Sequence, residues 1–588
     1  MEYPPFFANK EKKKEWKIRE DKGVLERIHQ VVWGPWLMVL FLGVGVYYTL
    51  RSGLFQLLGA KTWWRATAGS LGRTGKEQVK TACTALAATV GTGNITGVAT
   101  AIAAGGPGAL FWMWVSAAAG MMTAYGEVYL GIKSRYALPG GGMACGPYVY
   151  LEHLAGQKGL AILYALLCIL GSLGMGSMVQ ANSLAETASY SFGIPEGAAA
   201  ALLCLTAALV IRGGRRRIGE AAAGLIPFSA GLYMVFSLAV LFLCREELLG
   251  ALQSIFREAF KAPAVLGGAA GTGVSGAVRY GLARGVFSNE AGLGSMAVLH
   301  GDAPSQGLQT PGVPGPGVSG PGVPGQGVPS PGVPGQGVPG SGVSGPGVPG
   351  QGVPGSGVPG QGVPGSGVPG QGAPGKSTLS QDAALQGMWA MFEVFFDTIV
   401  VCTLTGLVIL CCTGAGAGAA GGAGVAGGAG AAGGAGAEAV PGGAALAAWC
   451  FSLHLGNAGG YVVSLSMILF AFGTVIAWYY LGSQALTYLA SLLGGKGGKN
   501  APARAVTLYQ LFYLCALSAG CVASMEKVWL LSDIVNGLLA LPNLAALILL
   551  AGQVEFPARL RLSQVSHISE NGVFWIVVFL GAVRLLFL

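Results

Sequence analysis

Two glycine-containing stretches within apolar segments carry the residues best suited to bind a small polar ligand. The first runs from Thr84 to Gly106 and has Gly91, Thr92 and Gly93 at its middle. Glycine costs roughly 1 kcal/mol relative to alanine in a helix interior, and an unpaired backbone group finds no water inside a bilayer. An interrupted helix here would offer backbone N–H groups to a carboxylate and carbonyl oxygens to a cation. Close helix packing through small residues accounts for the same composition equally well on local grounds.

The second stretch, Gly285 to Ser295, repeats these features and adds the amide of Asn289 and the carboxylate of Glu290. An ionisable residue inside a membrane is functional by default, so Glu290 could pair with a ligand ammonium group. The alternative is that Glu290 braces an interrupted helix by accepting backbone N–H bonds. Five apolar segments separate the starts of the two stretches, which is the pattern of an inverted five-plus-five helix repeat. This coincidence favours interrupted helices over simple packing.

The overall composition indicates a polytopic membrane protein. Of the 588 residues, 52% are hydrophobic and 10% are charged, whereas soluble domains carry about 25% charged residues. The formal net charge of +9 therefore relates to membrane topology and lipid contact, and we expect no nucleic-acid partner. The cysteines and histidines form no metal-ligand motif, and no phosphate-binding loop or dinucleotide motif is present, so we expect neither an enzyme nor an organic cofactor.

Eleven apolar segments are long enough to span a bilayer, and a twelfth at 572–588 is uncertain. The eleven segments are 31–50, 80–105, 107–133, 160–189, 197–212, 218–244, 277–300, 386–412, 459–493, 504–524 and 527–552. The predicted organisation is a basic tail at 1–30, an N-terminal helix with the first repeat and core helix six at 31–300, an elastin-like Gly/Pro/Val loop at 301–380, core helix seven at 381–412, a Gly/Ala-rich loop at 413–447, core helices eight to ten at 448–552 and a C-terminal tail at 553–588.

Lys and Arg gather in alternate loops, for example at 212–217 and 496–504. The positive-inside rule places these loops in the cytoplasm. The elastin-like loop then also lies in the cytoplasm, and the Gly/Ala-rich loop lies outside. The basic N-terminal tail conflicts with this arrangement if the segment 31–50 crosses the membrane, and we expect that it does.

Several long motifs resemble the alanine or glycine:cation symporters, also called sodium:alanine symporters. They are LAATVGTGNITGVATAIAAGGPGALFWMWV (86–115), RGVFSNEAGLGS (284–295), FFDTIVVCTLTGLVIL (395–410), FAFGTVIAWYYLG (470–482) and SDIVNGLLALPNL (532–544). The resemblance implies a LeuT-like fold with one extra N-terminal helix, about eleven transmembrane helices in all. It also implies Na⁺-driven uptake of small neutral amino acids such as alanine and glycine, with Na⁺ as the coupling ion.

The same resemblance suggests particular ligand contacts. It implies that Gln180 contacts the substrate carboxylate, although its position alone is equally consistent with a helix–helix hydrogen bond. It also implies a sodium site in which the carbonyl oxygens of Ala88 and Thr89 face Thr474. The family usually has Ser or Thr just before this threonine, whereas this chain has Gly473, so one oxygen ligand is lacking.

Three further residues complete the predicted site. Asn94 is a candidate for a second cation site, because Na⁺ prefers hard oxygen donors. Asp397 could bind Na⁺, or it could pair with Arg279 or Arg284. Trp478 lies four residues after Thr474, on the same helix face. It could close the pocket above a small side chain, or it could be an ordinary packing contact.

Two other residues of the last core helix, Asp533 and Asn536, suit gating or packing better than ligand binding. The leading hypothesis is a monomeric, sodium-coupled symporter in the plasma (cell inner) membrane that works by alternating access. One alternative is a proton-coupled amino-acid carrier with the same fold. The other is a non-transporting membrane sensor or surface-display protein that presents the elastin-like loop.

Overall fold

The computed structural model describes residues 23–71, 75–138, 142–260, 276–304, 376–413, 443–493 and 501–557. Most of the basic tail, the elastin-like repeats, most of the Gly/Ala-rich stretch and the uncertain segment 572–588 lie outside these residues. In the described part the chain is almost entirely helical, which agrees with the predicted all-α class. Two short strands, β1 (Tyr136–Ala137) and β2 (Met143–Ala144), pair antiparallel beyond the end of one long helix.

The N-terminal region is an apolar helical segment, Gly23–Arg51, with a turn at Trp33 and Gly34 before its second part, α2 (Pro35–Arg51). Two short helices follow, α3 (Phe55–Leu58) and α4 (Ala60–Ala66). This N-terminal helix packs against α7 (Gly108–Ser134) and α22 (Met525–Leu549). The hydroxyl of Tyr48 donates to the carbonyl of Leu547 at 2.8 Å, which joins the two ends of the described chain.

The first half of the remaining chain supplies the helices that precede residue 260. They are α5 (Lys76–Thr89), η2 (Thr92–Asn94), α6 (Thr96–Gly105), α8 (Pro147–His153), α9 (Lys158–Leu173), the π-helical η3 (Gly174–Val179), α10 (Gln180–Phe192), α11 (Glu196–Ile211), α12 (Gly214–Leu243) and α13 (Arg245–Ala259).

The second half supplies the helices from residue 276 onward. It contains α15 (Gly276–Asn289), α16 (Ser295–Leu299), η4 (His300–Asp302), α17 (Lys376–Val394), the π-helical η5 (Phe395–Cys402), α18 (Thr403–Thr413), α20 (Gly443–Leu493), α21 (Ala501–Val522) and η6 (Ala551–Gln553). α20 begins inside the stretch predicted as a Gly/Ala-rich loop, and it is kinked at Gly456, where φ is +66°.

Seven described helices are long and apolar enough to cross a membrane, and the bent pair α5 and α6 makes an eighth span. Helices α7, α11 and α15 coincide with three further predicted segments but are shorter or less apolar than these eight spans. The expected number of eleven transmembrane helices, and the LeuT-like arrangement, therefore stay predictions. α13 was not predicted, because its charged residues separate its apolar positions.

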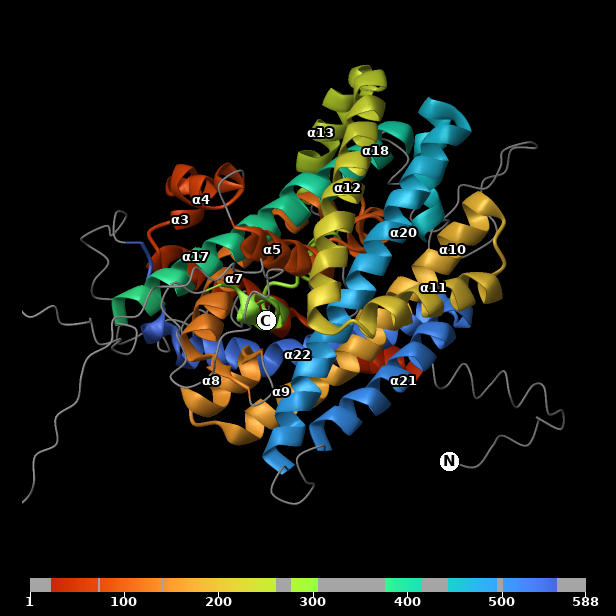
Figure 1. Ribbon diagram of the computed structural model, residues 1–588. Helices are drawn as coiled ribbons and strands as arrows, with labels where there is room; N and C mark the ends of the chain where they lie inside the picture. Colours follow the sequence, from red (N-terminus) through yellow and green to blue (C-terminus); the bar gives the residue numbers. More distant parts are fainter. Residues whose placement is uncertain are drawn as a thin grey trace, which may run out of the picture. The chain divides into compact units, whose positions relative to one another are not determined.

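Helix α7 packs against α15 and α17, and α20 packs against α9, α10 and α12 (Figure 1). Small residues allow this close approach. A Cβ added at Gly281 of α15 would lie 2.4 Å from the carbonyl oxygen of Ala109 on α7. At Gly285 the same addition would lie 2.8 Å from Ser116. These two glycines therefore serve helix packing.

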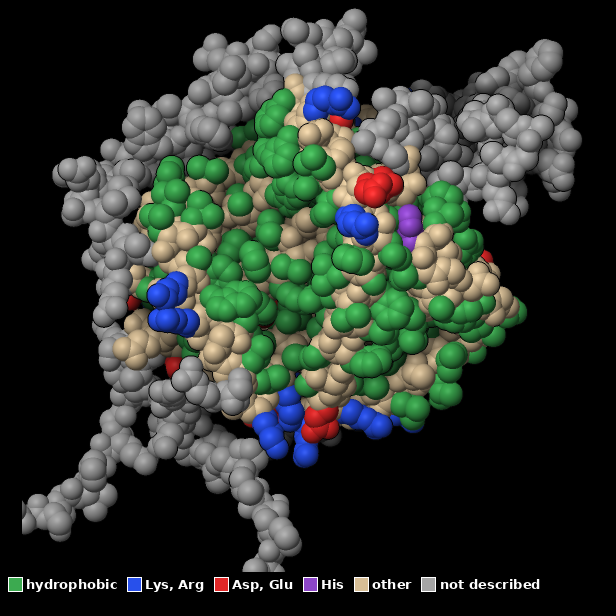
Figure 2. Space-filling view, turned by 90° about the horizontal axis from the view of Figure 1, so that it is seen from above, with side chains coloured by type: hydrophobic (Ala, Val, Ile, Leu, Met, Phe, Trp, Pro, Cys, Tyr) green, Lys and Arg blue, Asp and Glu red, His purple; other side chains and the backbone are tan. Residues whose placement is uncertain are grey.

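The protein surface carries many large apolar side chains. Figure 2 shows one face that is largely hydrophobic, with charged side chains mainly toward its edges. The exposed apolar residues include Leu202, Leu205 and Leu209 on α11, and Phe228 and Phe242 on α12. Soluble monomers rarely expose so much continuous apolar surface, whereas lipid tails cover such a surface favourably.

Candidate functional site

The first predicted interruption is present. α5 ends at Thr89 and α6 begins at Thr96, with a bend of 57° between the two helical halves. The N–H of Gly91 donates to Oδ1 of Asn94 at 2.9 Å. A Cβ at Gly91 would lie 2.5 Å from Oγ1 of Thr474, so only glycine brings the backbone this close to α20.

Gln180 reaches this break from the neighbouring helix. It is the first residue of α10 and follows the π-helical η3, a type of irregularity that is frequent at functional sites. Its Oε1 accepts hydrogen bonds from the N–H of Thr92 at 3.2 Å and from the hydroxyl of Thr92 at 3.0 Å. The Gln180 side chain therefore already accepts from the backbone N–H of Thr92, a donor that a substrate carboxylate could use. Gly93 lies on the other side, where an added Cβ would be 3.2 Å from the ring of Phe287.

The second interruption is also present. α15 ends at Asn289, and the backbone of Glu290 lies in the left-handed region at a φ of +54°. Gly292 and Gly294 follow with φ values of +95° and +79° before α16 begins. Left-handed geometry is costly for a side chain such as glutamate, and strained backbone of this kind clusters at binding sites.

The carboxylate of Glu290 is fully buried and has two side-chain partners. Its Oε1 accepts from the indole Nε1 of Trp478 at 2.8 Å, and its Oε2 accepts from the hydroxyl of Ser295 at 2.5 Å. If Glu290 only braced the interrupted helix, its carboxylate would accept from backbone N–H groups; the two donors here are side chains instead. Two predicted site residues, Glu290 and Trp478, are therefore in direct contact.

Asp397 connects the two interruptions. Its fully buried carboxylate accepts from Asn94 Nδ2 at 2.6 Å, from Ser288 Oγ at 2.6 Å and from Thr398 Oγ1 at 2.9 Å. Asn94 belongs to the first break and Ser288 precedes the second. Asp397 itself lies in the π-helical η5. Two hydroxyl oxygens and one amide nitrogen therefore surround this carboxylate.

The alternative that Asp397 pairs with an arginine is wrong for Arg284. Arg284 Nη2 lies 2.5 Å from Oδ2 of Asp533, and the guanidinium also stacks over Trp529 at 5.0 Å. The guanidinium of Arg279 lies 6.0 Å from the ring centroid of Tyr280. Asp533 therefore ties α22 to α15, consistent with the predicted gating or packing role.

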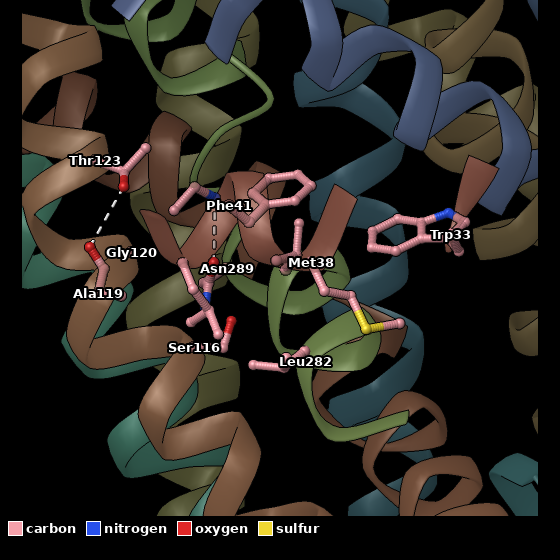
Figure 3. Close-up of a pocket in the computed structure, with 12 residues that line it drawn as sticks. Trp33, Met38, Phe41, Ser116, Ala119, Gly120, Thr123, Leu282 and Asn289 are labelled. Carbon is pink, nitrogen blue, oxygen red and sulfur yellow. Dashed lines mark hydrogen bonds between the residues drawn. The ribbon is translucent and has the colours of Figure 1, made fainter. Parts of the chain in front are cut away.

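Asn289 lies beside a small cavity between the N-terminal helix, α7 and α15 (Figure 3). Its Nδ2 donates to Thr398 Oγ1 at 3.2 Å, and its Oδ1 accepts from the N–H of Ala291 at 3.1 Å. The cavity has a volume of about 20 Å³, which is room for about one water molecule. An amino acid could enter only after side chains move apart.

Thr474 contacts the first broken helix, one position earlier than expected. Its hydroxyl donates to the carbonyl of Ala87 at 2.9 Å and to that of Phe470 at 3.2 Å. The expected carbonyls, those of Ala88 and Thr89, follow directly in the chain. A Cβ at Gly473 would lie 3.8 Å from the same Ala87 oxygen.

A sequence profile of the sodium:alanine symporter family matches residues 19–312 and 367–559. The chain belongs to the sodium:alanine symporter family. The family consists of transporters, so this member is an amino-acid:cation symporter rather than an enzyme. Together with its long apolar helices, membership makes it a multi-pass integral protein of the cell membrane.

Characterised and uncharacterised relatives cover almost the whole chain. The chain is 32% identical to an uncharacterized transporter of Haemophilus influenzae, over 90% of this chain and 93% of the relative. It is 31% identical to the sodium/alanine symporter AgcS of Methanococcus maripaludis, over 90% and 95%. It is 25% identical to the amino-acid carrier protein AlsT of Bacillus subtilis, over 88% of each chain.

This symporter also contains buried polar residues that the sequence did not single out. Glu127 accepts from Asn543 at 2.6 Å, and Asn543 also donates to the carbonyl of Gly292 in the second break. His300 Nε2 lies 3.1 Å from Oε1 of Glu393, with both side chains fully buried. An ionisable residue in an apolar segment is a functional candidate by default. The sequence therefore offers the same reason to single out Glu127 and Glu393 as it offers for Glu290.

Proposed function

We propose that this protein imports alanine, glycine or similar small neutral amino acids together with Na⁺, by alternating access on a LeuT-like fold. The observation that carries the proposal is the buried carboxylate of Asp397, which binds Asn94 of one broken helix and Ser288 of the other. A cation at this point would interact with both halves of the repeat at once. Its binding would then be coupled to the geometry of both breaks.

The substrate carboxylate would bind at the first break. The N–H groups of Gly91 and Thr92 are occupied by Asn94 and Gln180 in the described conformation. A substrate carboxylate would take over these donors, as anions do at broken helix ends. Gly93 and Gln180 complete this end of the proposed site.

The substrate ammonium would bind at the second break. Glu290 is the acidic group there, and it now accepts from Trp478 and Ser295. An ammonium group would replace one of these neutral donors with a charged one, so that the hydrogen bond becomes an ion pair with the carboxylate. Trp478 and Asn289 would then limit the space for the side chain, which favours substrates of about the size of alanine.

Sodium would bind between the breaks. Asp397, Ser288 and Thr398 supply carboxylate and hydroxyl oxygens, and Asn94 supplies an amide oxygen if its side chain turns. The carbonyls of Ala88 and Thr89 with Thr474 form the second proposed sodium position. The name of the relative AgcS, a sodium/alanine symporter, supports the same ion and substrate.

Uptake of labelled alanine into proteoliposomes tests this proposal. We expect accumulation with an inward Na⁺ gradient and none with a proton gradient alone. Accumulation driven by the proton gradient without Na⁺ would instead support a proton-coupled carrier. A variant that lacks residues 311–375 should keep its uptake, whereas a sensor or display protein would show no accumulation with either version.

A further inference from the structure

A chain of buried polar side chains joins both broken helices to α17. His300 is the first residue of η4, directly after α16, and its Nε2 lies 3.1 Å from Oε1 and 3.2 Å from Oε2 of Glu393. Nδ1 of the same ring lies 2.9 Å from Oε1 of Gln386, which precedes Glu393 on α17. Gln386 in turn pairs with Gln78, in the first turn of α5. All four side chains are buried, and none of them belongs to the proposed substrate or sodium sites.

The two glutamine amides show which atom of Gln386 faces the imidazole. Nε2 of Gln386 donates to Oε1 of Gln78 at 2.7 Å, and Nε2 of Gln78 donates to Oε1 of Gln386 at 3.1 Å. Turning one amide alone would oppose donor to donor and acceptor to acceptor. Turning both would keep the amide pair, but it would present an N–H group to Nδ1 of His300. The ring would then be neutral, and the carboxylate of Glu393 would be buried without a positive partner, which is unfavourable.

Both ring nitrogens of His300 therefore face oxygen acceptors. Oε1 of Gln386 accepts from Nδ1–H, and the carboxylate of Glu393 accepts from Nε2–H. Only the imidazolium form carries hydrogens on both nitrogens. The distances from Nε2 to the two oxygens of Glu393 are nearly equal, at 3.1 and 3.2 Å, which suits a carboxylate that shares one N–H group. A carboxylic acid would instead hold its hydrogen on one oxygen.

We propose that His300 and Glu393 form a proton-binding site inside the membrane, in which one proton is held as an imidazolium–carboxylate pair. Glu393 lies within the membrane-spanning helix Ser380–Thr413, where a carboxylate without a counter-charge is unfavourable. The pair as a unit is neutral, and Gln386 accepts from the remaining N–H group of the ring. Buried pairs of this kind titrate together, so the proton belongs to both residues.

The surroundings of the pair contain further ionisable groups with other partners. Among the described residues, those that face the pair are Arg135 of α7, Asp302 of η4, Cys83 of α5 and Cys145 after β2. Arg135 donates from Nη1 to two backbone carbonyls, and Asp302 forms an ion pair with Arg215. Glu393 therefore takes its counter-charge from His300.

The site connects proton binding to the two broken helices. α5 packs against α16, η4 and α17, so that halves of both broken helices meet beside this pair. Loss of the proton would leave one uncompensated negative charge among these packed elements and would weaken the described arrangement. Glu393 also lies four residues before Asp397 of the proposed cation site. The proposal rests on the contacts of the pair, and not on the identity of the transported ion or amino acid.

The pH dependence of unfolding in detergent counts this proton. An unperturbed histidine loses its proton at about pH 6.5, so above that pH the unfolded chain carries no proton on either residue, whereas the folded protein carries one. The folding equilibrium constant should therefore fall about tenfold per pH unit through this pair alone. Glu393→Gln removes the carboxylate that retains the proton, and the tenfold contribution should disappear. His153→Gln removes an exposed imidazole of α8 and should leave the contribution unchanged.

Nitrogen-15 NMR of histidine-labelled protein is a second measurement that needs no change at the pair. It is made at alkaline pH in His29→Gln, because His29 is the other described histidine close to a carboxylate, 3.6 Å from Asp533. We expect one of the remaining rings to carry hydrogens on both nitrogens. Identical pH profiles for the unsubstituted protein and Glu393→Gln would overturn the proposal, and so would a spectrum in which all remaining rings are neutral. If Glu393→Gln does not fold, the ring spectrum decides by itself.

Discussion

The indole Nε1 of Trp478 donates a hydrogen bond of 2.8 Å to Oε1 of Glu290, although 188 residues separate them in the chain. The contact links α20 to the backbone turn at which the second broken helix changes direction. Glu290 is fully buried, and its left-handed backbone depends on its surroundings. The acidic group of the proposed ammonium site and the aromatic wall of that site are therefore held by one bond.

Replacing Glu290 by Gln should weaken alanine binding by at least about 30-fold, which corresponds to about 2 kcal/mol for a hydrogen bond to a charged group. The amide keeps the shape of the side chain but removes its charge. Binding of labelled alanine to the purified protein measures the effect. Glu247→Gln, on the exposed part of α13, is the matched control and should bind normally. Equal affinity in the two variants would exclude Glu290 from the site.

Gly176→Ala should displace Trp478, because the new Cβ would lie 2.2 Å from Trp478 Cβ. Overpacking of this kind typically costs about 1–3 kcal/mol. We expect weaker alanine binding and a lower unfolding temperature. Gly171→Ala is the control, since its Cβ would lie at an ordinary 3.5 Å from the same indole ring. Similar behaviour of the two alanine variants would mean that the position of Trp478 does not matter.

Gly473→Ser should strengthen Na⁺ binding. A Cβ at this position would lie 3.8 Å from the carbonyl oxygen of Ala87, so a hydroxyl group would add one oxygen ligand beside Thr474. If this additional ligand contributes about as much as a net hydrogen bond, about 1 kcal/mol, the affinity for Na⁺ should rise about fivefold. The Na⁺ concentration for half-maximal alanine uptake reports the change. Gly473→Ala controls for added bulk against Ile226, and an equal shift in both variants would argue against an oxygen ligand.

The ion pair between Arg284 and Asp533 should stabilise the closed contact between α15 and α22. Arg284 is partly exposed, and Asp533 also lies 3.6 Å from Nε2 of His29, so removing one partner should cost some, but not all, of the about 3–5 kcal/mol that a fully buried pair loses. Arg284→Gln and Asp533→Asn should therefore each lower the unfolding temperature in detergent. The double variant should lose less than the sum of the two. Strictly additive losses would show that the two residues act independently.

Both interruptions could be predicted from the sequence, but only because two such stretches recur five apolar segments apart; each stretch alone is equally consistent with close helix packing. Gly91 and Gly93, and Gly292 and Gly294, stand next to hydroxyl and amide groups in apolar segments, and an uninterrupted transmembrane helix would not need this combination. The partners of these groups could not be predicted in the same way. Ser288, Thr398 and Ser295 are ordinary residues for a membrane helix, and they acquire a role only because packing brings them to Asp397 and Glu290.

Backbone irregularities account for most of the remaining differences. The π-helical η3 and η5 shift the register of the residues that follow, and no composition signal marks them. From the sequence, Arg284 could pair with Asp397, but in the structure it pairs with Asp533. The sequence does not say how a helix is turned about its own axis, and this turn decides which neighbouring helix a side chain faces. The contact of Thr474 with Ala87, one position from the expected carbonyls, has the same origin.

The most direct test of the proposed cation site is the Na⁺ dependence of labelled alanine uptake in proteoliposomes for Asp397→Asn. The asparagine keeps the size of the side chain but removes the charge that Asn94 and Ser288 share. Glu247→Gln serves as the charge-removal control. We predict that the unsubstituted protein and the control accumulate alanine only with an inward Na⁺ gradient, and that Asp397→Asn loses this dependence together with its uptake. Accumulation by Asp397→Asn with unchanged Na⁺ dependence would contradict the assignment of Asp397 as the cation ligand that joins the two broken helices.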